Sequence, residues 1–314
     1  MLLGVALSMI MKSLIGAVTV ALLFWQSCTC SLSKDNIKLD GSSTVFVISE
    51  AIAEEYKKQN QENVSIGISG TGGGFKKFCS KRIDIIGASR AITDSEKELC
   101  RKNAVDYVEL PVANDGIVVV VNKENSWLND IRVSTLRKIF EPAAEGKITK
   151  WSDVNPAWPD RKFEIFAPGI ASGTYDYFTK EIVGKEHSSR GDITSSEDDN
   201  VLVHGIRSTL DSIGFFSFAY YLENQSSLKA LAIINDLAGI NHKPVLPTAA
   251  TIQSGAYQPL ARPVFLYAAK ELRPNERNFV KFYLENCSKI AKDVGFVPLS
   301  EEEQKAAFTK LAEE

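Results

Sequence analysis

Short β-type runs and segments with helical spacing alternate along most of the chain. A β-type run at residues 36–44 precedes a helical pattern at 47–59, and another run at 63–70 precedes a helical pattern at 75–82. The β-type runs alternate apolar with polar residues, whereas the helical patterns place apolar residues three or four positions apart. Repetition of strand, turn and helix is typical of an α/β protein.

Two later runs are mainly apolar. They are GIVVVVN at residues 116–122 and FEIFAPG at residues 163–169. Strands that are buried on both faces lose the alternation of apolar and polar residues, so these runs predict central strands of a parallel or mixed sheet. The polar stretch at 186–200 is expected to form a surface loop.

The first thirty residues predict a signal peptide. Residues 13–25 are apolar, Lys12 precedes them, and small and polar residues follow at 27–33. The apolar run is shorter than the roughly 18 residues that a membrane helix needs. We expect cleavage near residue 30 and export to the periplasm, with an uncleaved anchor as the alternative. Cys28 and Cys30 lie near the cleavage point and leave attachment of a lipid open.

Composition and charge add two expectations. The 314 residues are 44% hydrophobic and 24% charged, which is ordinary for a globular protein, and the length favours two lobes. The formal net charge is −3, from 36 Lys and Arg against 39 Asp and Glu. Because no polybasic run interrupts the chain, we expect no nucleic acid partner.

Three cysteines follow the signal segment. In an oxidising compartment we predict a disulfide between Cys79 and Cys100, and we expect Cys287, in a helical pattern, to be a buried free thiol. No two cysteines have CxxC spacing, and the three histidines, at 187, 204 and 242, are widely separated. We therefore expect neither a metal site nor a cofactor.

Three turns share one kind of chemistry. Residues 40–46 (DGSSTVF), 69–75 (SGTGGGF) and 171–178 (ASGTYDYF) each place glycine and hydroxyl residues at the start of a helical pattern. Glycine allows close approach of the backbone, and N–H groups at a helix start favour an anion. Ordinary helix capping explains a single turn of this kind more often than anion binding does, but three in one chain favour an anion site.

Motifs of catalysis match poorly. SGTGGG lacks the spacing of a dinucleotide fingerprint, and EPAAEGKIT lacks the first glycine and the hydroxyl residue of a P-loop. GIASG around Ser172 is not a nucleophile elbow, and no histidine lies in a partner motif. We therefore do not expect an enzyme.

Nine motifs occur in order along the chain. They are DGSSTVF, SGTGGGFKKFC, DIIGASR, NDGIVVVVN, GKITKWSDVNPAWPD, PGIASGTYDYF, SSEDDNVLVHGI, SIGFFSFAYY and PLARPVFLY. Together they resemble the substrate-binding protein of the bacterial high-affinity phosphate transporter. The resemblance spans about residues 36–300.

The resemblance implies a two-lobed periplasmic binding protein of the type 2-like class, with mixed sheets, flanking helices and a hinge of crossing strands. Lobe I is expected at residues 31–114 plus 255–314 and lobe II at 115–254, with the return crossing at Tyr257–Pro263. Ligand would select the closed form by a hinge motion. Such a protein is a monomer that captures inorganic phosphate and delivers it to the inner-membrane permease of an ATP-driven importer.

The family's phosphate shell, carried over position by position, falls on seven residues of this chain. They are Ser43, Thr44, Thr71, Arg90, Ser172, Gly173 and Thr174. Many short hydrogen bonds in a dry cleft can hold phosphate, so the chain can be acidic and still bind an anion. Arg90 is expected to supply the one full positive charge on the ligand, through two of its N–H groups.

The sequence departs from part of the family at two positions. Some relatives have an Asp that accepts the proton of hydrogen phosphate where this chain has Arg90, and an Arg where it has Pro168. Another carboxylate must then accept the proton, and Asp115 is our candidate, with Asp40 and Asp176 as alternatives. Arg90 as a surface residue and Asp115 as a turn residue remain the simpler interpretations.

Two further functions remain open at this stage. A secreted phosphatase would need a base beside Ser172 or Thr174. A surface protein could keep the fold and bind no ligand.

Overall fold

The computed structural model describes residues 36–237 and 241–312, which lie in one compact unit. The expected signal peptide at residues 1–30, with Cys28 and Cys30, lies outside the described residues, as do residues 31–35. The strands are β1 Ile37–Gly41, β2 Val64–Ile66, β3 Ile85–Ala88, β4 Tyr107–Asn122, β5 Asp130–Arg132, β6 Glu164–Pro168, β7 Thr194–Ser196, β8 Ser212–Ser217, β9 Leu228–Ala230, β10 Ala232–Asn235, β11 Asn241–Val245 and β12 Ala261–Ala269.

The helices lie between these strands and after the last one. The α-helices are α2 Ser43–Asn60, α3 Gly70–Phe78, α4 Asp94–Lys102, α5 Val133–Phe140, α6 Trp151–Val154, α7 Gly173–Phe178, α8 Asp199–Ser208, α9 Phe218–Asn224, α10 Ala249–Gln253, α11 Pro274–Asp293 and α12 Glu301–Ala312. A 3-10 turn covers Pro142–Ala144, and a π-helical turn covers Thr179–Val183 directly after α7.

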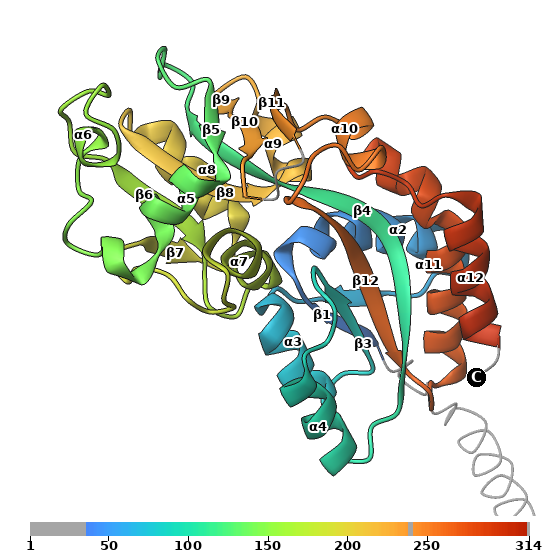
Figure 1. The fold of residues 1–314 in the computed structure, drawn as a ribbon. Helices are drawn as coiled ribbons and strands as arrows, with labels where there is room; N and C mark the ends of the chain where they lie inside the picture. Colours follow the sequence, from blue (N-terminus) through green and yellow to red (C-terminus); the bar gives the residue numbers. More distant parts are fainter. Residues whose placement is uncertain (1–35, 238–240, 313–314) are drawn as a thin grey trace, which may run out of the picture. The chain divides into compact units, whose positions relative to one another are not determined.

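One mixed sheet runs through the unit in the order β2-β1-β3-β12-β4-β8-β6-β7, with β9 also paired to β4. We call β2, β1, β3 and β12 the first part of the sheet, and β8, β6, β7 and β9 the second part; β4 belongs to both. β12 pairs antiparallel with β3 and β4, while β1 pairs parallel with β2 and β3. Figure 1 shows the long strands β4 and β12 running side by side.

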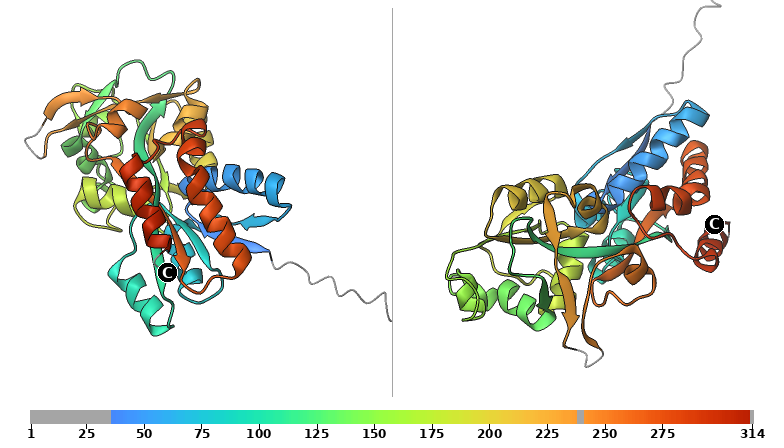
Figure 2. Two further views of the ribbon diagram at one scale, coloured as in Figure 1. Left: turned by 90° about the vertical axis from the view of Figure 1, so that its right-hand side faces the viewer. Right: turned by 90° about the horizontal axis from the view of Figure 1, so that it is seen from above.

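Helices cover both faces of the first part. Alternate residues of β12 belong to different cores: Val264 and Leu266 pack with α2, α11 and α12, whereas Phe265 and Tyr267 pack with α3 and α4. Figures 1 and 2 show α11 and α12 beside β4, and Figure 1 shows α3 next to β1 and β3. Burial on both faces accounts for the apolar character of these strands.

The second part has its own core. The run Ile117–Val121 of β4 is fully buried among residues of β6, β8 and the helices around them. The rings of Phe178 and Phe215 stack there with centroids 3.7 Å apart. A smaller sheet, in the order β11-β10-β5, lies beside this part of the chain. The mixed sheet predicted from the apolar runs is therefore confirmed.

The polar stretch at 186–200 differs from the expected surface loop. It contains β7 and the first two residues of α8, and its Arg190 and Asp199 are buried, with exposed fractions of 4% and 0%. Arg190 is paired with Asp192 and donates to the carbonyls of Ile139 and Ile148. Polarity alone misplaced these residues. Arg190 is stable when buried because it is paired, and Asp199 is buried although one of its carboxylate oxygens has no partner among the described residues.

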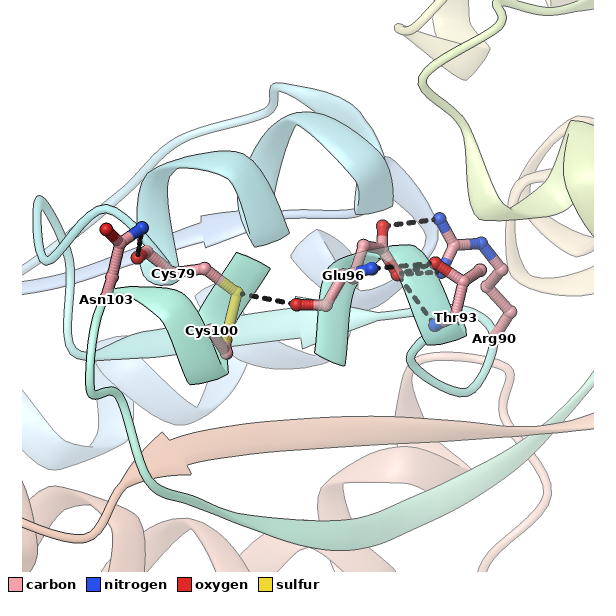
Figure 3. Close-up of a disulfide and its surroundings, with 6 residues drawn as sticks. All are labelled: Cys79, Arg90, Thr93, Glu96, Cys100 and Asn103. Carbon is pink, nitrogen blue, oxygen red and sulfur yellow. Dashed lines mark hydrogen bonds and ion pairs between the residues drawn. A yellow bond between two sulfur atoms is a disulfide. The ribbon is translucent and has the colours of Figure 1, made fainter. Parts of the chain in front are cut away.

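The predicted disulfide between Cys79 and Cys100 is confirmed. It joins the residue after α3 to α4, as Figure 3 shows, and the two cysteines are 21 positions apart in the sequence. Cys287 is buried and free within the described residues, as expected, and burial raises the pKa of its thiol to about 11.

Candidate anion site

The first hydroxyl turn joins β1 to α2. Gly41 has φ 138°, and a Cβ there would lie 2.2 Å from the carbonyl oxygen of Gly87, so only glycine allows this turn to pack against β3. The turn is fixed by a hydrogen bond from the Ser42 N–H to the same carbonyl, 2.9 Å. Ser43 and Thr44 follow at the start of α2 and are buried.

The second turn opens α3 and touches the second part of the sheet. Gly70 has φ 73°, and a Cβ on it would lie 2.5 Å from the Ala171 carbonyl oxygen. Two residues later the Gly72 N–H donates to that same carbonyl at 2.9 Å. Thr71 is fully buried; its Oγ1 accepts from the Ser89 N–H and lies 3.2 Å from Ser89 Oγ. The hydroxyls of Thr71 and Ser89 therefore form a pair on the first part.

The third turn brings α7 to these hydroxyls from the second part. Ser172 caps α7 by accepting a hydrogen bond from the Thr174 N–H, 3.1 Å. A Cβ on Gly173 would lie 2.6 Å from Thr71 Oγ1 and 2.7 Å from Ser89 Oγ, so glycine is needed for this approach. Thr174 is 1% exposed, and its Oγ1 lies 3.2 Å from Oγ1 of Thr44. The three turns predicted from sequence thus converge.

A buried arginine joins the two parts at this point. Arg262 of β12 donates from Nη2 to Oγ1 of Thr174 at 2.7 Å and to Oγ1 of Thr44 at 3.4 Å. Its Nη1 donates to the Gly173 carbonyl at 3.2 Å, and its side chain has no exposed surface. Arg262 was not among the site residues predicted from the sequence, although it lies in the motif PLARPVFLY. The signal that could have identified it was an arginine inside an apolar strand.

Asp115 is the ion-pair partner of Arg262. The two residues face each other in the register of β4 and β12, and Asp115 Oδ2 accepts from Nη2 at 3.0 Å and from Nε at 3.3 Å. Its Oδ1 accepts from the Phe218 N–H at 3.2 Å. Burial raises the pKa of Asp115, and the Arg262 guanidinium opposes that rise. Both carboxylate oxygens are therefore already hydrogen-bonded by protein groups.

Arg90 lies beside the hydroxyl turns but is held by carboxylates. Its Nη1 and Nη2 each donate to Glu96 at 2.8 Å, and its Nε donates to Asp176 at 2.6 Å. A fourth bond, from Nη1, reaches the Ala91 carbonyl at 3.1 Å. Since arginine has five N–H groups, little of the fork expected for the ligand remains. Burial would lower the pKa of Arg90, but Glu96 and Asp176 outweigh burial and raise it.

The two alternative carboxylates are also engaged. Asp40 accepts from Ser69 Oγ and the Gly41 N–H, both at 2.7 Å, and is paired with Lys77. Burial opposes ionisation of Asp40, but these hydrogen bonds outweigh it and its pKa is lowered. Asp176 is bonded to Arg90, and its Oδ1 lies 3.0 Å from Nδ1 of His187.

A further carboxylate, Asp199, lies against the first turn. Its Oδ1 accepts from Ser43 Oγ at 3.4 Å, and its Oδ2 has no hydrogen-bond partner among the described residues. The side chain is fully buried at the first residue of α8. Burial raises the pKa of Asp199 to about 7, with Arg262 opposing the rise and Asp115 adding to it. Asp199 was not among the site residues predicted from the sequence, because it lies in the stretch that was expected to be a loop.

One cavity of about 430 Å³ lies next to the convergent turns. It is lined by residues of both parts, among them Arg90, Tyr177, Lys180 and Phe265, and by none of the convergent hydroxyls. The hydroxyls instead bond to one another and to Arg262; because each hydroxyl carries one O–H donor that can rotate, it can donate to an anion instead.

Within residues 36–237 and 241–312, no cluster of His, Cys, Asp and Glu could hold a metal ion. The same residues contain no helix that is both long and apolar enough to span a bilayer.

Comparisons with known proteins define the class first. A sequence model of the PBP superfamily domain matches residues 31–286. The protein SphX of Synechococcus elongatus is 49% identical over 278 residues, which are 88% of this chain and 81% of that protein. The phosphate-binding protein PstS of Staphylococcus saprophyticus is 38% identical over 281 residues, covering 88% of this chain and 84% of the relative.

Solved structures give the same result. The crystal structure of a possible phosphate binding protein from Planctomyces limnophilus is 41% identical and superimposes with a TM-score of 0.64, covering 88% of this chain and 98% of that one. A putative substrate-binding protein of a phosphate transporter from Clostridium perfringens, at 22% identity and a TM-score of 0.69, shares the fold. The chain therefore belongs to the SphX and PstS family of the PBP superfamily, whose fold is that of a two-lobed periplasmic binding protein.

Proposed function

We propose that the chain is the substrate-binding component of an ATP-driven phosphate importer and holds inorganic phosphate where the three hydroxyl turns meet. The observation that carries this function is the convergence of Thr44 and Thr174 on one terminal nitrogen, Nη2, of the buried Arg262. The two threonines come from different parts of the sheet, so a ligand between them is bound by both. The protein is a binding protein and not an enzyme, as its SphX and PstS relatives support.

The proposed shell contains hydroxyls, backbone N–H groups and one guanidinium. From the sequence analysis it keeps Ser43, Thr44, Thr71, Ser172, Gly173 and Thr174, and it gains Ser89 and Arg262. Neutral donors in a dry cleft bind an anion strongly because the low local dielectric strengthens each hydrogen bond. Arg262 replaces Arg90 as the proposed cation on the ligand, because Glu96 and Asp176 already hold Arg90.

Asp199 replaces Asp115 as the proposed acceptor of the ligand's proton. Phosphate near neutral pH carries a proton that sulfate lacks, so a buried acceptor without another partner favours phosphate and disfavours sulfate. Both oxygens of Asp115 are bonded within the protein, whereas Oδ2 of Asp199 is not bonded by any described group. Asp199 also bonds directly to Ser43 of the first turn.

The proposed lobes follow the boundaries expected from the sequence, 31–114 plus 255–314 and 115–254. β4 runs from lobe I into lobe II, and β12, which lies in lobe I, pairs with β4 as far as Gly116 of lobe II, which supports a hinge at these strands. We also propose export to the periplasm, delivery of phosphate to a membrane permease and a monomeric state. Attachment of a lipid at Cys28 or Cys30 is proposed only from the position of these cysteines near the expected cleavage point.

Calorimetric titration of phosphate, arsenate and sulfate into ligand-stripped protein tests this function. We expect phosphate and arsenate to bind and sulfate to bind about 5- to 150-fold more weakly, since a buried unpaired group costs about 1–3 kcal/mol. Asp199→Asn should reduce that ratio by about tenfold, whereas the control Asp160→Asn, at an exposed carboxylate, should leave it unchanged. Failure of the wild-type protein to bind any of the three anions would refute the function. An unchanged ratio in Asp199→Asn would refute the acceptor alone.

A further inference from the structure

The guanidinium of Arg90 is held in a fixed orientation by residues of α3 and α4, which pack on the first part of the sheet. Glu96 of α4 accepts from both terminal nitrogens of the guanidinium at 2.8 Å, and the Phe75 ring of α3 lies 5.8 Å from its Cζ. Glu96 also accepts from the Thr93 N–H and hydroxyl, both at 2.9 Å, so its carboxylate is fixed by the cap of its own helix. Figure 3 shows the Glu96 carboxylate facing both Arg90 and Thr93, with dashed lines to each. The guanidinium is thereby oriented by residues of one part alone.

The remaining strong bond of Arg90 crosses to the second part. Its Nε donates to Oδ2 of Asp176 in α7 at 2.6 Å, with exposed side-chain fractions of 7% and 1%. Asp176 lies two residues after Thr174, whose hydroxyl meets Thr44 and Arg262. The ion pair therefore fixes the same short helix that presents the hydroxyl of the second part.

We propose that Asp176 is a positioning residue, and that its ion pair with the pre-oriented Arg90 holds the two parts together around the ligand without contacting the ligand. This inference rests on the proposed function. The inference concerns a different interaction from the one that binds the ligand. The hydroxyls and Arg262 bind the anion, whereas the Arg90–Asp176 pair slows separation of the two parts. An interaction formed only in the closed state lowers the rate of ligand release and leaves capture by the open state unchanged.

The disulfide stabilises the two helices that orient the guanidinium of Arg90. Cys100 lies one helical turn after Glu96 on α4, and Cys79 directly follows α3, which carries Phe75. The bond thus joins the two helices that orient the guanidinium, as Figure 3 shows for the α4 side. Removal of the disulfide should make the contacts of Glu96 and Phe75 with Arg90 less rigid and so weaken the Arg90–Asp176 ion pair indirectly.

The test compares Asp176→Asn with the wild-type protein and with a control, Asp94→Asn. The control makes the same substitution of an aspartate by asparagine at an exposed residue of α4. Release of bound radioactive phosphate is followed after a chase with unlabelled phosphate, and the association rate is measured separately. We expect release to be about tenfold faster in Asp176→Asn, with association changed by less than about twofold, and no change in Asp94→Asn. The phosphate-to-sulfate affinity ratio should stay at the wild-type value.

Several outcomes would overturn the inference. They are an unchanged release rate, a slower association rate that accounts for the whole loss, or a fallen phosphate-to-sulfate ratio, which would place Asp176 on the ligand itself. Thermal unfolding of each ligand-free variant shows whether it is folded. Should the wild-type protein bind no phosphate, the proposed function fails, but X-ray scattering still tests the pair: ligand-free Asp176→Asn should be more open than wild type.

A double-mutant cycle tests the disulfide. Replacing both Cys79 and Cys100 by serine should accelerate release about threefold in the wild-type background and not at all in Asp176→Asn, because coupled residues are not additive. Equal acceleration in both backgrounds would show that the disulfide acts independently of the pair.

Discussion

Replacement of Asp199 by asparagine should abolish a loss of folding stability that the wild-type protein shows as pH rises. The Asp199 side chain is fully buried, and its pKa is raised from the usual 3.8 to about 7, chiefly by burial. The folded state therefore binds a proton more tightly than the unfolded state does. Where the folded pKa is the higher one, stability is greatest below the unfolded pKa and falls as pH rises through the folded pKa.

The structure sets the size of this effect. The difference between about 7 and 3.8 is roughly three units, and each unit corresponds to about 1.36 kcal/mol, so the ionised Asp199 destabilises the ligand-free protein by up to about 4 kcal/mol above pH 8. That is a large share of the 5–15 kcal/mol typical of folded proteins. Asparagine cannot ionise, so the variant lacks this loss.

Urea denaturation of ligand-stripped protein at intervals between pH 4 and pH 9 measures the effect. The unfolding free energy of Asp199→Asn minus that of wild type should rise with pH by about 3–4 kcal/mol, mainly between pH 4 and pH 7. The control Asp160→Asn removes an exposed carboxylate whose pKa is lowered by Ser152 and Lys150, so its difference should be small and should change in the opposite direction. A difference for Asp199→Asn that stays constant with pH would refute the argument.

Two further predictions concern the buried ion pair and the threonines. Arg262→Met leaves the Asp115 carboxylate buried without its partner and should destabilise the protein by about 3–5 kcal/mol in urea unfolding, while Asp115→Asn added to it should recover most of that loss but not phosphate binding. No recovery in the double variant would contradict the pairing. Thr174→Val should weaken phosphate binding by at least about fivefold in calorimetry at unchanged fold, and affinity within twofold of wild type would exclude contact of this hydroxyl with the ligand.

The fold was largely accessible from the sequence. The apolar run at 116–122 predicted a strand buried on both faces, and the structure places it in β4 at the centre of the sheet. The disulfide between Cys79 and Cys100 was also predictable, since few cysteines remained after the signal segment. Periodicity and turn chemistry act over neighbouring residues, so they can be interpreted without knowing the remainder of the chain.

The charged residues of the site were less accessible. Arg90 and Arg262 are both arginines next to apolar segments, and the sequence offers no means of telling which one has carboxylate partners. In the structure Arg90 is paired with Glu96 and Asp176, whereas Arg262 donates hydrogen bonds to two threonines. Likewise, Asp199 belongs to a polar stretch that suggests exposure, yet it is fully buried.

The sequence by itself determined the α/β architecture, the three glycine and hydroxyl turns and, through nine motifs in order, the family. Only the tertiary structure decided which charges meet which partners. The physical reason is the range of the interactions: strand and helix patterns and turn conformations depend on residues within a few positions, whereas burial and pairing of a charge depend on segments far apart in the chain. Asp115 and Arg262, 147 positions apart, become neighbours only when β4 and β12 pair.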